Sequence, residues 1–165
     1  MAVDVRIGRR QVLKGAGAVG VGALAALAPA TVLADNADSD DRLLGTWHAP
    51  HTHETGPFAG RTTDGNFTFT PGGAFLADDT DQQATGLGNW VKSAENGFRF
   101  TFHIFIFNAS FPSGTKVKVR AQGTHDGDTI RGRFSFQVYL PGGDPIPGVA
   151  GSGSFKGARI PIEPV

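Results

Sequence analysis

The stretch Gly97-Phe98-Arg99-Phe100-Thr101-Phe102-His103-Ile104-Phe105-Ile106-Phe107-Asn108 is the longest apolar strand pattern in the chain. Side chains of a strand alternate between its two faces. One face therefore carries Phe98, Phe100, Phe102, Ile104 and Ile106, and the other begins with Arg99, Thr101 and His103. Phe105 and Phe107 then make the second face apolar as well. A strand that starts half-polar and ends apolar on both faces is typical of a closed or strongly curled sheet.

Shorter strand patterns lie on both sides of this stretch, separated by clusters of Gly, Pro, Asn and Asp. They fall at residues 43–51, 66–70, 74–78, 86–92, 115–125, 130–140 and 149–160. The Asn96-Gly97 and Asp126-Gly127 pairs suit tight hairpin turns. Helical periodicity is absent from residue 43 onward. The sequence therefore predicts an all-β fold, a single antiparallel up-and-down β-barrel of about eight strands over residues 43–165.

Composition narrows the possible functions. The 165 residues include 24 Gly, 13 Phe and no Cys, and their formal net charge is zero. Without cysteine there are no disulfides, thiol nucleophiles or zinc-thiolate sites. Near-neutral charge argues against nucleic acid as a partner. Lys116, Lys118 and Arg120 are interpreted as the outer face of one strand rather than a phosphate track.

The first residues have the pattern of an export signal. Gly8-Arg9-Arg10-Gln11-Val12-Leu13-Lys14 precedes a Gly/Ala-rich apolar run and resembles a bacterial twin-arginine signal peptide, predicted at 1–34. Residues 35–42 are predicted as an acidic, disordered linker. Removal of 1–34 leaves 11 basic and 14 acidic residues, a net charge of −3. The resemblance implies the twin-arginine translocase as an export partner, a secreted or periplasmic location, and no stable membrane anchor after cleavage.

Two features resemble a known group of barrels. Gly45-Thr46-Trp47 on the first strand and Arg159 on the last are similar to the calycin pattern, in which an arginine packs across a tryptophan at the barrel floor. Phe67-Thr68-Phe69-Thr70-Pro71-Gly72-Gly73 and Gly86-Leu87-Gly88-Asn89-Trp90 look more like the allene oxide cyclase, dirigent and spirotetronate cyclase barrels. This resemblance implies an apolar cavity, no metal and no organic cofactor. None of the family's catalytic residues maps onto this sequence.

We therefore expect a cavity that binds a small hydrophobic molecule. Its predicted lining is Trp90, Phe98, Phe100, Phe102, Ile104, Phe134 and Phe136. An alternative is a cofactor-independent cyclase or isomerase that folds a polyketide-like or terpenoid-like substrate in the same cavity. A further alternative is a fully packed barrel with a structural or protein-binding role. Homo-oligomerisation stays open.

Several polar residues have two interpretations. His51 and His53, next to Glu54, could bind a metal, or they could be a solvated pair in a loop or frayed strand at the barrel mouth. Asp78, Asp79 and Asp81 are interpreted as a solvated loop rather than a calcium site.

Two further residues are catalytic candidates. If His103 pointed into the cavity it could orient or protonate a ligand, but the continuous Phe/Ile face is the natural interior. That favours an outward His103. Tyr139 shares a face with Arg131 and Arg133 and has the same two interpretations.

Overall fold

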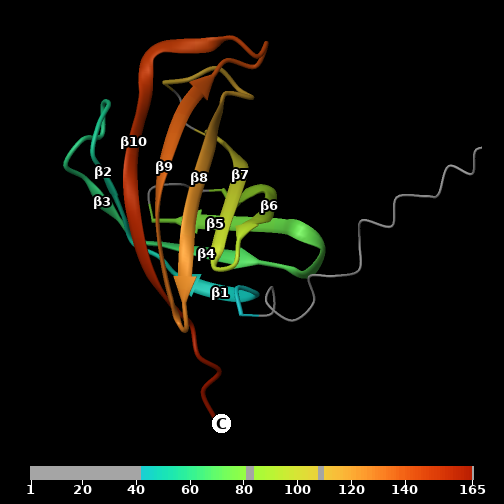
Figure 1. Cartoon of the computed structure of the whole chain (residues 1–165). Coiled ribbons are helices and arrows are strands. Elements are labelled where there is room, and N and C mark those ends of the chain that lie inside the picture. Colours follow the sequence, from blue (N-terminus) through green and yellow to red (C-terminus); the bar gives the residue numbers. More distant parts are fainter. Residues whose placement is uncertain (1–41, 81–83, 108–109, 165) are drawn as a thin grey trace, which may run out of the picture. The chain divides into compact units, whose positions relative to one another are not determined.

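The computed structural model describes residues 42–80, 84–107 and 110–164, and it is built almost entirely of β-strands (Figure 1). The predicted signal peptide and the predicted linker up to residue 41 lie outside the described residues. No helix in these ranges is long and apolar enough to cross a membrane. The strands are β1 (Gly45–His48), β2 (His51–His53), β3 (Thr62–Thr63), β4 (Gly65–Phe69), β5 (Ala74–Asp79), β6 (Gly86–Ala94), β7 (Gly97–Phe105), β8 (Lys116–Asp126), β9 (Thr129–Tyr139) and β10 (Pro145–Arg159).

The sheet closes on itself. Its order is β1-β4-β5-β6-β7-β8-β9-β10, every neighbouring pair is antiparallel, and β10 also pairs with β1 through Trp47 opposite Arg159. The short strands β2 and β3 extend the sheet beyond β10. This confirms the predicted all-β, eight-stranded antiparallel barrel. Closure leaves no edge within the eight-stranded ring, so its phenylalanine-rich strands are protected from pairing with other chains.

The N-terminal region differs from its prediction. The expected strand at 43–51 is split, because β1 ends at His48 and β2 begins at His51. Pro50 lies in the interruption and has no backbone N–H to donate. His51–His53 form a strand that pairs with β10 on one side and β3 on the other, rather than a loop. The last strand is longer than predicted and starts at Pro145, with a register irregularity before Ala150.

The barrel interior pairs phenylalanine rings with glycines on adjacent strands. A Cβ atom at Gly153 would lie 2.5 Å from the ring of Phe134, and one at Gly132 would lie 2.4 Å from the ring of Phe155. Rings can therefore lie flat over neighbouring strands only where those strands carry no side chain. This pairing explains why glycines occur within strands beside the phenylalanine rings.

One end of the barrel, here called the floor, is sealed by Trp47 and Arg159. Trp47 is fully buried and donates its indole N–H to the carbonyl of Leu43 at 2.9 Å. The Arg159 guanidinium lies 4.2 Å from the centre of the Trp47 ring and also donates to Asp128 and to the carbonyls of Leu44 and Arg42. A guanidinium can stack on a ring while its edge donates several hydrogen bonds.

Gly45 has a specific role at this floor. Its φ of 115° is in a region that other residues rarely adopt, and a Cβ there would lie 3.0 Å from the Arg159 Nη1 atom. Backbone conformation and the position of the guanidinium thus both favour glycine. The Gly-x-Trp motif of the sequence therefore has a local physical explanation in the packing of Arg159.

Replacing Arg159 with lysine tests this arrangement. We expect Arg159→Lys to lower the free energy of unfolding by about 2 kcal/mol, because an ammonium keeps the charge but loses the planar stack and most of the hydrogen bonds. Urea denaturation followed by tryptophan fluorescence measures it. Lys156→Arg, an exposed change on the same strand, should have almost no effect. Equal stability of Arg159→Lys and the unmodified chain would contradict the proposed role.

His125 is buried at the floor end of β8 and gives a second prediction. Burial lowers the pKa of His125, and the positive charges of Lys92, Arg159 and Arg42 lower it further against the opposing effect of Asp126. The unfolded chain therefore binds a proton at a higher pH than the folded chain does. We expect the free energy of unfolding to fall as the pH drops through about 6.5, the ordinary value for histidine.

Urea denaturation at about pH 7.5 and about pH 5.5 measures this fall in the free energy of unfolding. Most carboxylates stay charged over this range. The pKa of His103 is also lowered, so it contributes with the same sign. The pH dependence should shrink in His125→Gln and shrink further in the His103→Gln/His125→Gln double variant. An unchanged dependence in the double variant would contradict the assignment.

Candidate ligand-binding cavity

A cavity of about 390 Å³ lies inside the barrel towards the end opposite the floor. We call this end the mouth. It is the end where β7 stops at Phe105 and β8 starts at Lys116, and it is uppermost in Figure 1. The cavity is lined by His51, His53, Phe58, Arg61, Phe67, Ala77, Asp78, Asp79, Phe100, Phe102, Ile104, Ile106, Phe107, Phe111, Val117, Val119, Phe134, Phe136, Val138, Val149 and Phe155.

Most of the wall is aromatic or aliphatic. The inward face of β7 contributes Phe100, Phe102 and Ile104, and that of β9 contributes Phe134 and Phe136, so these five predicted residues border the cavity.

The other two residues of the predicted lining, Trp90 and Phe98, do not border it. They pack in the core cluster nearer the floor, where both rings contact Phe69. Alternation identifies the inward face of a strand, but it does not show how far along the barrel axis the cavity extends.

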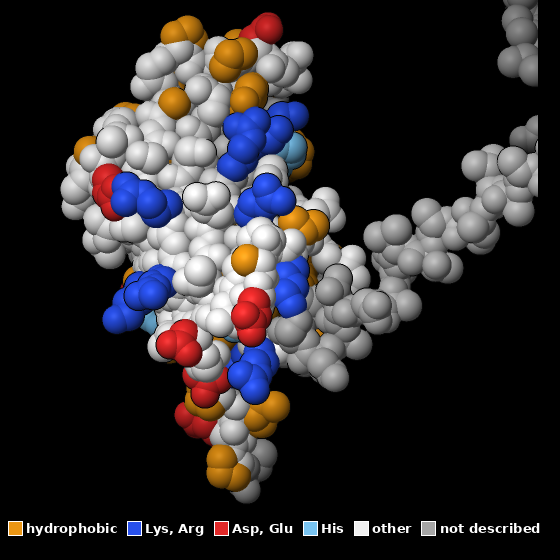
Figure 2. All heavy atoms as spheres, viewed as in Figure 1, with side chains coloured by type: hydrophobic (Ala, Val, Ile, Leu, Met, Phe, Trp, Pro, Cys, Tyr) orange, Lys and Arg blue, Asp and Glu red, His pale blue; other side chains and the backbone are white. Residues whose placement is uncertain are grey.

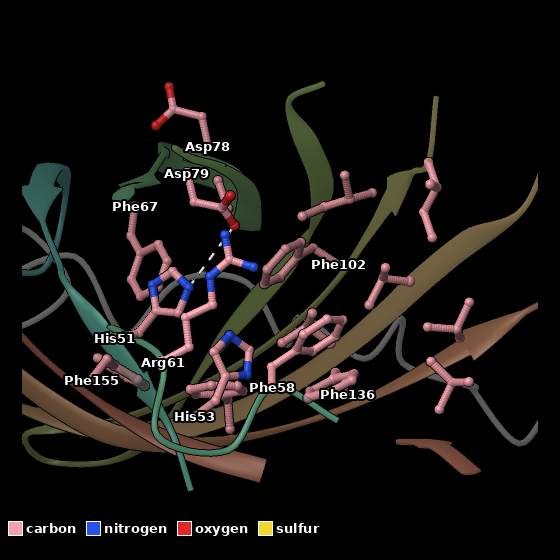
Figure 3. A pocket seen from close by; sticks show the side chains of 18 of the residues that line it. His51, His53, Phe58, Arg61, Phe67, Asp78, Asp79, Phe102, Phe136 and Phe155 are labelled. Atoms are coloured by element: carbon pink, nitrogen blue, oxygen red, sulfur yellow. Dashed lines mark ion pairs between the residues drawn. The ribbon is translucent and has the colours of Figure 1, made fainter. Parts of the chain in front are cut away.

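One side of the cavity is polar. His51 and His53 point inward from β2, Asp79 points inward from the end of β5, and Arg61 reaches the same place from the loop between β2 and β3 (Figure 3). The His51 Nε2 atom lies 4.0 Å from the Asp79 Oδ2 atom, and their side chains are only 11% and 15% exposed. The Arg61 guanidinium points towards Asp79 in the same view. Charged and hydrogen-bonding side chains thus form one side of the cavity, and apolar side chains form the rest of its wall.

Aromatic rings fix the orientation of both histidines. His51 stacks on Phe67 and meets Phe134 edge-on, with centroid distances of 6.5 and 5.7 Å. His53 meets Phe134 and Phe136 edge-on at 5.3 and 5.5 Å, and its Nδ1 atom is buried. The interpretation of these histidines as a solvated pair is wrong, because their side chains line the cavity.

A metal site at this pair would need further ligands. In the described ranges, no group of three or more His, Asp or Glu side chains is arranged to hold a metal ion. His51 instead contacts Asp79 and the carbonyl of Ala49, the latter at 3.5 Å.

The acidic segment also differs from its prediction. Asp78 points outward and accepts a hydrogen bond from Asn66, but Asp79 points into the barrel, so treating the whole segment as a solvated loop was wrong for Asp79. Asp81 lies outside the described residues.

His103 and Tyr139 lie outside the cavity. His103 lies on the outward face of β7, between the inward residues Phe102 and Ile104. Tyr139 lies on the outward face of β9, directly after the inward residue Val138. Desolvation lowers the pKa of His103, and the charges of Lys116, Lys118 and Arg120 on the adjacent strand lower it further. Neither residue can contact a molecule in the cavity, so the structure does not support their catalytic interpretation.

Sequence reasoning did not single out Arg61 or Phe58, which the loop between β2 and β3 brings to the cavity. The loop residues carry no period from which their direction could be inferred. Asp79 did have a signal, because it continues the inward series Phe75, Ala77 on β5. A carboxylate at the end of an otherwise apolar inward face is a candidate for ligand contact.

The fold and the cavity define a class of protein: a closed, eight-stranded antiparallel β-barrel with an internal cavity that is apolar on most of its wall and polar on one side. Comparison with protein-family models, with curated proteins and with solved structures gave no match. The closure of the barrel and the packing of Arg159 on Trp47 are consistent with a calycin-like fold.

Proposed function

We propose that this protein is an exported, calycin-like barrel that binds one small apolar molecule in its cavity. The observation that carries the proposal is the cavity of about 390 Å³ with its aromatic wall. A cavity of this size suits a small ligand, and burial of apolar surface supplies the affinity. Export through the twin-arginine pathway to a secreted or periplasmic location is part of the proposal, supported by the sequence pattern at 1–34.

The polar side of the cavity indicates which end group the ligand carries. Arg61 and Asp79 bring one positive and one negative charge, which cancel each other, and the ring nitrogens of His51 and His53 add hydrogen-bonding positions. Such a group offers both hydrogen-bond donors and acceptors without favouring a net charge. We infer an apolar molecule with an uncharged oxygen at one end, such as a hydroxyl or carbonyl.

Competition binding tests this inference. The full chain is titrated with the uncharged fluorophore N-phenylnaphthylamine, which is then displaced by a fatty alcohol or by the alkane of equal length. We expect the alcohol to bind more tightly. Asp79→Asn should weaken binding of the alcohol by about 10- to 100-fold, roughly the effect of one lost hydrogen bond to a charged group, and leave binding of the alkane unchanged. Asp126→Asn is the matched control, because Asp126 is exposed at the end of β8 and does not line the cavity. Equal affinities for alcohol and alkane would contradict the inferred end group.

A second candidate function is cyclisation or isomerisation of a substrate in the same cavity. The polar group beside the aromatic wall favours it, because a cyclase needs both a shaped volume and polar groups at one end. Conversion of a bound polyene or epoxide, detected by chromatography and lost in Asp79→Asn, would support it. The packed-barrel alternative fits less well, since the barrel retains an open volume.

A further inference from the structure

Large apolar side chains are exposed around the mouth. Phe58 is 39%, Phe105 51% and Phe107 72% exposed. Figure 2 shows apolar side chains gathered at this end of the described region, above a group of Lys and Arg side chains. Phe58 and Phe107 also border the cavity opening, whereas Phe105 points away from it. Exposed aromatic residues clustered at one place on a small domain commonly mark a contact surface.

Two lysines stand directly beside these rings. Phe105 is paired with Lys116 in the register of β7 and β8, and Lys118 follows on the same outward face. Neither lysine forms an ion pair with an acid in the described part of the chain. Residues two apart on a strand are about 7 Å apart, so both lysines lie within about one Debye length of a surface that touches Phe105. Desolvation lowers the pKa of His103 beside them, and the charges of Lys116, Lys118 and Arg120 lower it further, as a positive potential at this site would.

We propose that the mouth docks reversibly on an anionic lipid surface, with Phe105 and Phe107 entering the interface and Lys116 and Lys118 lying against the headgroups. Phenylalanine gains from leaving water, and lysine gains from a negative surface potential. Docking in this orientation brings the cavity opening to the bilayer. If the cavity binds a small apolar molecule, as proposed above, that molecule could then pass between the cavity and the membrane. The contact is peripheral and does not require a membrane-spanning segment.

The charges favour lipid over two other occupants. In a symmetric dimer through this surface, the lysines of both copies would face the same patch and repel each other. Nucleic acid would need a longer series of phosphate contacts than two lysines provide. Asp144, in the loop between β9 and β10, brings a negative charge to the mouth end and keeps the expected attraction moderate.

Co-sedimentation with vesicles tests the proposal. The full chain is mixed with vesicles of phosphatidylcholine alone or of phosphatidylcholine with phosphatidylglycerol. All variants retain residues 1–41, so this segment contributes equally to every measurement. We expect binding to the anionic vesicles to fall about 30-fold in Lys116→Gln/Lys118→Gln, roughly fivefold per lysine. We expect Phe105→Ser to weaken it about 5- to 10-fold and to do so in high salt as well.

The matched control is Arg131→Gln/Lys156→Gln, which removes the same charge near the floor. It should bind the anionic vesicles as the unmodified chain does. Equal losses in both double variants would mean attraction by overall charge and would overturn the proposal. So would unchanged binding in Phe105→Ser, or a dimer in solution that Phe105→Ser dissociates.

N-phenylnaphthylamine binding separates this proposal from the proposed function. None of these variants alters a residue that lines the cavity, so each should bind the fluorophore normally. Loss of vesicle binding with normal fluorophore binding supports docking as a separate property. Vesicle binding that depends on Phe105 and the two lysines, in a chain that binds no fluorophore, would support docking while contradicting the cavity function.

Discussion

Val119→Trp is expected to abolish ligand binding while the barrel remains folded. Val119 points into the cavity from the middle of β8 and is only partly buried, so an indole there would extend into the open volume. The affinity for N-phenylnaphthylamine should fall about 100-fold or more, because the ligand would lose most of the apolar contact that holds it. Fluorescence titration measures the affinity, and thermal unfolding should show a midpoint close to that of the unmodified chain.

Arg120→Trp is the control for this variant. It places the same side chain one position further along β8, on the exposed outer face, and should bind the fluorophore normally. Retained binding in Val119→Trp, in a chain that is still folded, would mean that the fluorophore binds outside the cavity. Loss of binding in both variants would indicate a general effect of the tryptophan.

Phe100→Ala is expected to cause a large loss of stability. Phe100 is 3% exposed and stacks on Phe75 with a centroid distance of 4.2 Å. Further ring contacts join it to Phe67, Phe69, Phe98, Phe102 and Phe155. Removing a buried phenylalanine ring costs about 3–5 kcal/mol, a large part of the stability of a small domain. Urea denaturation should show this loss as a lower midpoint with a similar slope.

Phe107→Ala provides the comparison, since Phe107 is 72% exposed. Its effect on the free energy of unfolding should stay within about 0.5 kcal/mol. If Phe100→Ala were no more destabilising than Phe107→Ala, the ring cluster around Phe100 would not be the core of the barrel. The same comparison distinguishes apolar residues that stabilise the fold from those left exposed at the mouth.

The alternation in 97–108 was sufficient to predict which face of this strand is the interior, for a physical reason. A strand places every second side chain on one face, so Phe98, Phe100, Phe102 and Ile104 must all face the interior if one of them does. The same rule predicted His103 on the outside, where the structure has it. Short hairpin turns make consecutive strands neighbours in the sheet. Closure was expected because it removes the exposed edges that phenylalanine-rich strands would otherwise have.

The polar side of the cavity could be predicted only in part. His51, His53 and Asp79 stand out in the sequence, but they come from β2 and β5, which are not paired strands. No local pattern encodes how close they lie. Arg61 comes from a loop, whose residues have no fixed facing. The extent of the open volume depends on how rings and glycines of neighbouring strands pack together, which explains why Trp90 and Phe98 were wrongly expected to line it.

The most direct test of the central claim is native mass spectrometry of the full chain after incubation with a panel of fatty alcohols, terpenoid alcohols and phenols. The account predicts at least one complex with a single bound molecule per chain, and the loss of that complex in Val119→Trp. If no member of the panel binds, or if the complex forms equally well in Val119→Trp, the cavity is not a ligand-binding site.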